Sequence, residues 1–406
     1  MAEMRPIGID QTTGQQRTVD SDDNVVNNIG DQIQISVKSV GDYSEGTNQV
    51  QVLYPWDTPN LLVDPASTPG VNGTGIRWSP NGEYLYIGNV STSPPSLKVY
   101  QKVGTTLLLL DAPASVPAAN CNQGAWSPNG EFLSAGSDSS PFLFNYQREG
   151  STFTLLTDPA SAPTGAVQDA DWSPNGELLA TAHTNSPFLS VYQRDNTTLN
   201  KIADPATLPG ANGSPVAANG CRWAPNGEFL AVASGGNPKL TLYQLTSPTT
   251  LEKLADPASL PSGGSSSRSV SWSPDSQFLA LVDQSDAERL IIYQRSGTTF
   301  TRLSAPASLV GSPQRCSFSP SGDYLAVTSS AADYLSIYQR SGTTFTLLDA
   351  PASTPGGVSV NQDWSPDQQF VSVFRTSAPY LRTFQTSGIM PSSGIVTIIG
   401  QTLAGS

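Results

Sequence analysis

Short runs in which apolar and polar residues alternate cover most of the chain from about residue 49 onwards. In the clearest example, an alternating run over 167–172 ends in tryptophan, the tetrapeptide Ser-Pro-Asn-Gly follows, and a second apolar run covers 178–183. A period of two predicts β-strands. The Pro presets the first corner of the turn, and the Gly accepts the left-handed conformation that closes a hairpin. The pattern therefore predicts a β-hairpin anchored by an aromatic residue.

This anchored hairpin recurs along the chain at intervals of 46 to 51 residues. Its anchors are Trp78, Trp126, Trp172, Trp223, Trp272, Phe318 and Trp364. After each hairpin we expect a third strand that carries an aromatic residue. A fourth strand, ending near an Asp-Pro-Ala-Ser-like sequence, follows every third strand but the last. Self-similarity with this period indicates a solenoid or a closed ring of β units.

The count of strands indicates a closed ring. The third-strand aromatic occurs at Tyr54, Tyr100, Tyr146, Tyr192, Tyr243, Tyr293, Tyr338 and Phe384, which is once more than the hairpin. The last hairpin has no fourth strand after it, and the strand-like segment 60–64 has no hairpin before it. Pairing the N-terminal strand with the last unit removes both defects. We therefore predict an all-β fold, a seven-bladed β-propeller of four-stranded blades closed by pairing its N- and C-terminal strands.

The ends of the chain do not follow the repeat, so three parts are predicted. Residues 1–48 form a short β-rich anchoring or docking segment, which is too small for a substantial core and needs a partner surface. Residues 49–385 form the propeller, and residues 386–406 form a C-terminal strand and tail. Within the tail, 395–399 is a strand whose partner the sequence does not identify.

Two resemblances follow from these motifs. The Trp-Ser-Pro-Asn-Gly turn and the third-strand aromatic make 49–385 similar to WD-repeat propellers, although the Gly-His dipeptide and Trp-Asp ending of true WD repeats are absent. The partners of WD scaffolds are therefore not carried over, and the fold alone implies no activity. The opening at 6–15, Pro-Ile-Gly-Ile-Asp-Gln-Thr-Thr-Gly-Gln, resembles the start of bacteriophage virion proteins, notably tail fibres and head decorations, in which a short N-terminal module docks onto the particle. The alternative is an ordinary β-rich leader that packs on the first blade.

Charge and composition narrow the partners. The net charge of −13 disfavours a nucleic acid or an anionic membrane surface. No run approaches the ~20 apolar residues of a membrane helix, so membrane insertion is not expected, and no secretory signal is visible at the N-terminus. We expect Cys121, Cys221 and Cys316 to be small buried thiols, which leaves the redox compartment open.

The sequence offers little for catalysis. The only histidine is His183, so no histidine cluster can bind a metal, and neither a cofactor nor a metal site is expected. His183 lies eleven residues after its anchor, at a position that is polar in every repeat. This position predicts the edge of a polar binding face; its residues are Asn89, Ser137, His183, Ser234, Asp283, Ser329 and Arg375. The alternative is a set of solvated loops with no specific role.

The residue directly before each anchor suggests contacts between blades. Asp171 is followed one repeat later by Arg222, and Asp363 is followed across the ring closure by Arg77. We predict two inter-blade ion pairs between innermost strands, which would set blade register more than they add stability. The alternative is four solvated charges along a central channel.

These observations predict a non-enzymatic structural and binding protein of a bacteriophage virion. Residues 1–48 would dock to other virion proteins, and the propeller would face outward as decoration or as a contact to a host-surface glycan or protein. A homo-oligomer is compatible with this interpretation. The alternatives are a bacterial scaffold or a glycan- or protein-binding propeller unrelated to phage, and, with less support, a propeller enzyme. Head or tail placement, the ligand and the host are not encoded in a recognisable motif.

Overall fold

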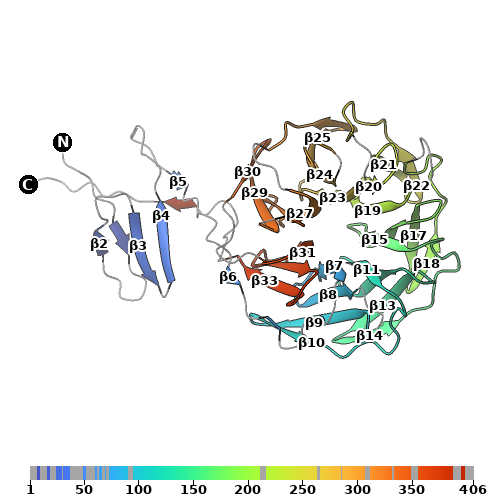
Figure 1. Cartoon of the computed structure of the whole chain (residues 1–406), viewed down its shortest axis with the longest axis horizontal. Helices are drawn as coiled ribbons and strands as arrows, with labels where there is room; N and C mark the ends of the chain where they lie inside the picture. The colour runs from blue at the N-terminus through green and yellow to red at the C-terminus, as the bar shows by residue number, and fades with distance from the viewer. Residues whose placement is uncertain are drawn as a thin grey trace, which may run out of the picture. The chain divides into compact units, whose positions relative to one another are not determined.

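The computed structural model divides the chain into two compact units, one of Thr58–Ser387 and one that combines Met1–Asp57 with Gly388–Ser406 (Figure 1). The structure describes seven short strands, β1 to β6 and β34, by their backbone alone; their bounds are given below. With side chains it describes residues 64–65, 69, 74–89, 95–210, 216–262, 266–284, 286–306, 311–331, 333–348 and 355–386.

The larger unit is a ring of seven four-stranded antiparallel sheets, numbered here as blades in chain order (Figure 1). Blade 1 comprises β7 (Gly73–Trp78), β8 (Tyr84–Asn89), β9 (Leu97–Val103) and β10 (Thr106–Leu109), and blade 2 comprises β11 (Cys121–Trp126), β12 (Phe132–Ser137), β13 (Leu143–Glu149) and β14 (Thr152–Leu155). Blade 3 comprises β15 (Val167–Trp172), β16 (Leu178–His183), β17 (Leu189–Asp195) and β18 (Thr198–Lys201), and blade 4 comprises β19 (Ala218–Trp223), β20 (Phe229–Ser234), β21 (Leu240–Ser247) and β22 (Thr250–Lys253). Blade 5 comprises β23 (Ser267–Trp272), β24 (Phe278–Asp283), β25 (Leu290–Ser296) and β26 (Thr299–Arg302), and blade 6 comprises β27 (Pro313–Phe318), β28 (Tyr324–Ser329), β29 (Leu335–Ser341) and β30 (Thr344–Leu347).

Blade 7 is assembled from both ends of the repeat region. Its first three strands are β31 (Ser359–Trp364), β32 (Phe370–Arg375) and β33 (Leu381–Gln385), and its outermost strand is β6 (Asn60–Leu61). The pairs Phe384–Leu61 and Gln385–Asn60 are antiparallel, as in the other blades. The predicted seven-bladed, all-β fold and its closure are therefore confirmed.

The other unit contains short paired strands. β1 (Ile7–Ile9) pairs with β2 (Gln16–Thr18), and β3 (Asn24–Ile29) pairs with β4 (Asp31–Ser36). β34 (Ile395–Thr397) pairs with β5 (Gln49–Gln51), which supplies the partner that the sequence left open for the C-terminal strand. The side chains of the proposed docking segment and the predicted third-strand Tyr54 lie outside the described residues.

The Ser-Pro-Asn-Gly turn is held by its own side chains. In blade 3, Ser173 Oγ accepts a hydrogen bond from the Leu178 N–H at 2.9 Å and donates to Asn175 Oδ1 at 2.6 Å. The Gly176 N–H donates to the Ser173 carbonyl at 2.8 Å, with Gly176 at a φ of 71°. A positive φ costs glycine little, so this local chemistry closes the hairpin wherever the tetrapeptide recurs.

The hydrophobic core lies between adjacent blades. Trp272, the anchor of blade 5, stacks on Phe229 of blade 4 with ring centroids 6.4 Å apart and meets Phe300 of its own outermost strand edge-on at 5.7 Å. Full burial of such a side chain stabilises the fold by roughly 1.5–3 kcal/mol. Because each anchor packs against the preceding blade, a blade by itself would expose its core face.

The three cysteines are free and buried, as predicted. Burial raises the pKa of the Cys121 thiol and that of the Cys316 thiol to about 12. A thiol that stays protonated is a poor nucleophile, so these side chains act as small core residues.

Candidate binding face around the ring axis

The pairing of strands defines two faces of the ring. Val167, at the start of β15, pairs with His183, at the end of β16. The loop from the second to the third strand therefore leaves the same face at which the first strand enters. We call this the loop face. The opposite face carries the Ser-Pro-Asn-Gly turns and is called the turn face.

The seven predicted rim positions lie at the loop face but are not exposed. Each is the last residue of a second strand and is at most 2% exposed: Asn89, Ser137, His183, Ser234, Asp283, Ser329 and Arg375. The interpretation as an accessible rim must be corrected, because all seven side chains are buried where their strands end. A partner would contact the loops and not these residues.

The buried polar side chains instead brace the loops from beneath. Ser234 Oγ donates to the Pro238 carbonyl at 3.0 Å, and Arg375 Nη2 donates to the Gly356 carbonyl at 2.9 Å. His183 Nε2 lies 3.0 Å from Ser190 Oγ on the neighbouring strand. Burial lowers the pKa of His183 to about 4, so its ring is neutral at pH 7.

The strongest brace is an ion network at blades 4 and 5. Asp283 is fully buried; its Oδ2 lies 3.2 Å from Lys239 Nζ and accepts a 2.7 Å hydrogen bond from Ser267 Oγ. Asp286 lies three residues after Asp283. Its Oδ1 is 2.9 Å from Arg302 Nη2, which also lies 2.7 Å from Glu288 Oε2. Burial alone would raise the pKa of Asp286, but the hydrogen bond from Arg302 and two backbone N–H groups hold it below its usual value. The loop after β24 is therefore pinned at several points.

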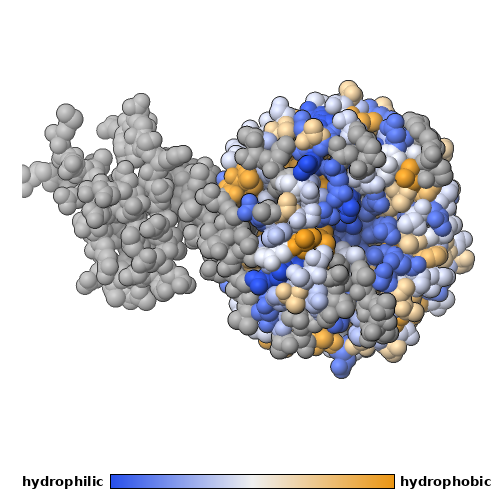
Figure 2. Space-filling model, in the orientation of Figure 1, coloured by the Kyte–Doolittle hydropathy of each residue, from blue (hydrophilic) through white to orange (hydrophobic). Residues whose placement is uncertain are grey.

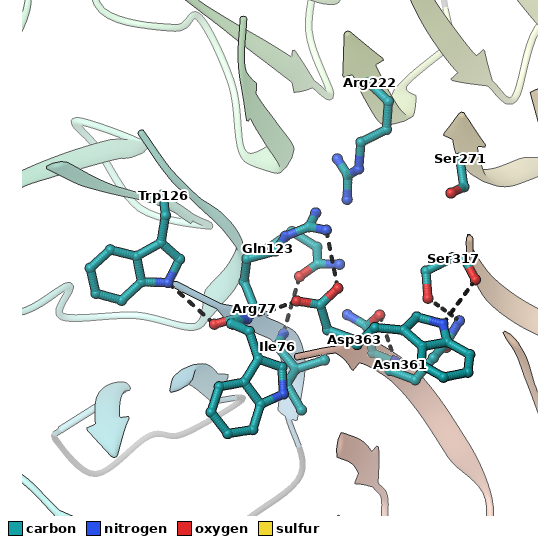
Figure 3. A network of polar contacts seen from close by, with 12 residues as sticks. Ile76, Arg77, Gln123, Trp126, Arg222, Ser271, Ser317, Asn361 and Asp363 are labelled. Carbon is teal, nitrogen blue, oxygen red and sulfur yellow. Dashed lines mark hydrogen bonds and ion pairs between the residues drawn. The ribbon is translucent and has the colours of Figure 1, made fainter. Parts of the chain in front are cut away.

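One of the two predicted inter-blade pairs forms where the sequence places it. Arg77 Nη1 lies 3.6 Å from Asp363 Oδ1, and the two side chains point toward each other near the ring axis (Figure 3). Asp363 Oδ2 also accepts a 2.7 Å hydrogen bond from the Trp78 N–H. Burial raises the pKa of Asp363, since Arg77 and the backbone donor only partly offset the loss of water.

The other predicted pair requires a correction. Arg222 Nη1 contacts Asp169 Oδ2 at 2.7 Å, not Asp171. A register shift between Val167 and Asp169 places the Asp169 carboxylate where it can also accept the Cys221 N–H at 3.1 Å. Asp171 Oδ2 accepts the Trp223 N–H at 2.8 Å, and burial raises the pKa of Asp171 to about 6.

Two arginines at the axis were missed because the sequence was compared only at the position before each anchor. Arg268 is the second residue of β23 and is exposed; Arg315 is the third residue of β27. Arg315 Nη1 donates to the Arg268 carbonyl at 2.8 Å and to the Asn219 carbonyl at 3.3 Å, so its side chain reaches over two neighbouring blades. In the described part of the chain, neither arginine has an ion pair with a carboxylate.

The turn face carries a second missed feature, the Arg of a recurring Tyr-Gln-Arg sequence. Arg194 Nε donates to the Gly176 carbonyl at 3.0 Å, and its guanidinium lies 5.2 Å from the ring centre of Phe132 in the preceding blade. The equivalent Arg148, Arg295 and Arg340, and Lys102, lie over aromatic rings in the same way. At these five boundaries the contacts tie a turn to the neighbouring blade, which makes the turn face a structural surface.

The Asp-Pro-Ala-Ser-like sequences also have a structural role. The third-strand Tyr146 and Tyr192 donate their hydroxyl hydrogens to the carbonyls of Ser115 and Ser161, at 2.9 and 3.0 Å. Within the described residues, no group of three or more His, Cys, Asp or Glu side chains is arranged to hold a metal. Nor does a helix among those residues have the length and apolar character needed to cross a bilayer.

Comparison with known proteins supports the fold. No protein-family model matches the chain, and no curated protein matches it. The chain is similar to a solved chain of a Kuenenia stuttgartiensis hydrazine synthase, with a TM-score of 0.60 and 15% identity over 80% of this chain and 99% of that chain. It is also similar to a chain of a mitotic checkpoint complex, with a TM-score of 0.60 and 17% identity over 86% of this chain and 99% of that chain. A third similar structure is the β-propeller domain of Myceliophteria thermophila Cps50 (Swd1), with a TM-score of 0.57 and 12% identity over 80% of this chain and 99% of that chain. At these identities the likeness shows the fold alone: a WD-repeat-like, seven-bladed β-propeller.

Proposed function

We propose that the chain is a non-enzymatic structural and binding protein, in which an N-terminal segment attaches a rigid propeller to a larger particle. One observation carries this proposal. The outermost strand of the last blade is Asn60–Leu61, and none of the described strands before it belongs to the seven sheets. The ring is therefore complete without residues 1–57, which form part of a separate compact unit. We propose that this segment, which supplies no strand to the seven sheets, binds the partner.

The particle we propose is a bacteriophage virion. The support is the resemblance of 6–15 to the openings of tail fibres and head decorations, in which such a segment docks to the particle. The protein would then be located in the virion, with other virion proteins as partners of its N-terminal segment. Its low content of charged residues, 13%, and its many Gly and Pro residues suit a turn-rich, rigid display module.

The loop face is the surface we propose for outward contact. Its loops are braced by buried polar residues and by the Asp283–Lys239 and Asp286–Arg302 pairs. Loops held by a rigid scaffold are the usual place for binding residues, because ordering them on contact costs little entropy. The turn face, by contrast, uses its arginines for contacts within the ring.

The test is attachment of two forms of the chain to particles. The full chain and a form lacking 1–48 are mixed with virions that lack the protein, and binding is measured by co-sedimentation. We expect the full chain to bind and the shortened chain to remain free, with both showing the same thermal unfolding of the propeller. Attachment of the shortened chain would refute docking through 1–48. If no particle takes up the full chain, a scaffold or binding propeller unrelated to phage replaces this proposal.

A further inference from the structure

We propose that the ring axis at the loop face holds a binding site for a small oxyanion group, a carboxylate or a phosphate, between Arg268 and Arg315. This site goes beyond attachment and display, and it does not depend on which particle carries the protein.

The innermost strands carry an excess of positive charge around the axis. Their charged residues are Arg77, Arg222, Arg268 and Arg315 against Asp169, Asp171 and Asp363. This excess occurs in a chain whose net charge is −13. The innermost strands thus carry one more positive than negative residue, opposite in sign to the chain as a whole.

The carboxylates at the axis are already engaged. Asp363 contacts Arg77 and accepts the Trp78 N–H, and Asp169 contacts Arg222 and accepts the Cys221 N–H. Asp171 accepts the Trp223 N–H. The two remaining arginines, Arg268 and Arg315, form no ion pair with a carboxylate of the described residues.

Only one of the three nitrogens of the Arg315 guanidinium forms hydrogen bonds within the described part of the chain. Only Nη1 donates, to the carbonyls of Arg268 and Asn219, and its Nε and Nη2 make no hydrogen bond to the described residues. Burial lowers the pKa of Arg315; the charge of Asp169 opposes this in part, and the charges of Arg222 and Arg268 add to the lowering. A guanidinium that is partly removed from water and faces like charges is destabilised, and a bound anion would offset this cost.

The site is accessible and polar. Arg268 is exposed, and Ser267 beside it pairs with Asp283, which places both at the loop face. Hydrophilic residues gather around the centre of the ring in the space-filling view (Figure 2). Deeper along the axis, Arg77 Nη2 is buried without a hydrogen-bond partner, so the axis has a further unused donor.

The geometry of guanidinium selects the ligand class. Its planar fork of N–H donors matches the two oxygens of a carboxylate or two oxygens of a phosphate, and such bidentate contacts are among the strongest hydrogen bonds in proteins. Arg315 is fixed by backbone carbonyls, whereas Arg268 is exposed and adaptable. One arginine would therefore orient the anion, and the other would close over it.

The experiment is calorimetric titration of the full chain with inorganic phosphate and, separately, with D-glucuronate, at constant ionic strength in chloride. We expect saturable binding of at least one anion, and the anion that binds identifies the group. Arg268→Gln and Arg315→Gln should each weaken binding by roughly ten- to a hundredfold. Lys201→Gln is the matched control, because it removes one positive charge from the outermost strand β18, and it should bind as the wild type does.

The proposal is overturned if neither anion gives saturable heat, or if both arginine variants bind as tightly as Lys201→Gln. Should Arg315→Gln fail to fold, Arg268→Gln still decides, since Arg268 is exposed and its loss leaves no buried group unpaired. Arg268→Gln should also attach to particles normally. Failure of anion binding and failure of particle docking can therefore be told apart.

Discussion

The backbone N–H of Trp78 donates a 2.7 Å hydrogen bond to Oδ2 of Asp363, although the two residues are 285 positions apart. The same contact recurs between other neighbouring blades, where the Trp223 N–H donates to Asp171 and the Phe318 N–H donates to Ser271 Oγ at 3.0 Å. The residue before one anchor thus binds the backbone of the next anchor. Where the chain ends meet, this contact joins the two ends of the repeat array.

Asp363→Ala should therefore destabilise the closure. It leaves the Trp78 N–H and the Arg77 guanidinium without their partner, and we expect a loss of about 1–3 kcal/mol in the free energy of unfolding. Asp363→Ser should lose less, because Ser271 shows that a serine hydroxyl can accept this N–H. Urea unfolding of the three proteins measures the order. Equal stability of the alanine and serine variants would show that the contact adds nothing.

The raised pKa of Asp171 predicts a pH dependence of stability. Its pKa is about 6 in the fold against an ordinary value of 3.8, so between these values the native state binds more protons than the unfolded state. This group therefore contributes stability at low pH that is lost as the pH rises from about 4 to about 6. Asp171→Asn removes this contribution, and it should gain up to about 3 kcal/mol relative to wild type between pH 4 and pH 7.

Urea unfolding at several pH values tests the Asp171 prediction. The exposed Glu149, at the end of β13, provides the matched control: Glu149→Gln should follow the wild-type curve. A curve for Asp171→Asn that runs parallel to wild type would mean that the carboxyl is ionised as easily in the fold as in the unfolded chain.

His183 should act in the opposite direction over the same range. Burial lowers its pKa from 6.5 to about 4, so the unfolded state binds more protons between these values, and stability is lost as the pH falls. We expect a loss of up to about 3 kcal/mol from this group. His183→Asn, which places at this position the residue found at Asn89, should remove the loss and leave the opposing Asp171 effect visible. An unchanged slope below pH 6.5 would contradict a buried, neutral ring.

The fold was predictable because its information is local and repeated. Each turn is closed by its own Ser, Asn and Gly, and the period of the anchors with one unmatched strand at each end implies the ring. The site was less predictable, since burial at the end of a second strand depends on how the next loop folds over it. The partner of Arg222 is the carboxylate of Asp169, two residues before the position that was compared, and the reach of Arg315 spans two blades. Neither follows from comparing aligned positions in the repeats.

Blade 4 has a natural exception to the arginine contacts of the turn face, and it gives the last prediction. The third strands of blades 2, 3, 5 and 6 place an arginine over an aromatic ring of the preceding blade, and blade 1 places Lys102 there. Blade 4 has Leu245 at this position, and the residue of blade 3 that corresponds to the ring is Leu178. Leu245 packs against the buried cluster that contains Leu178. Both members of the pair are leucine here, so an apolar contact replaces the cation–π contact at this boundary. The boundary between blades 6 and 7 differs, because it keeps the ring of Tyr324 and has Thr386 in place of the cation.

Leu245→Arg alone should destabilise the protein by about 1 kcal/mol, since it loses apolar burial and finds no aromatic ring. Leu178→Phe alone should cost a similar amount through overpacking. The double variant should be more stable than the sum of the two single effects predicts, with a coupling energy of about 0.5–2 kcal/mol. The reason is that the introduced guanidinium can then lie over the introduced ring, as Arg194 lies over Phe132. A double-mutant cycle from urea unfolding measures this coupling. Strict additivity would show that the arginine and the ring contribute independently, and that their joint absence from this boundary has no energetic basis.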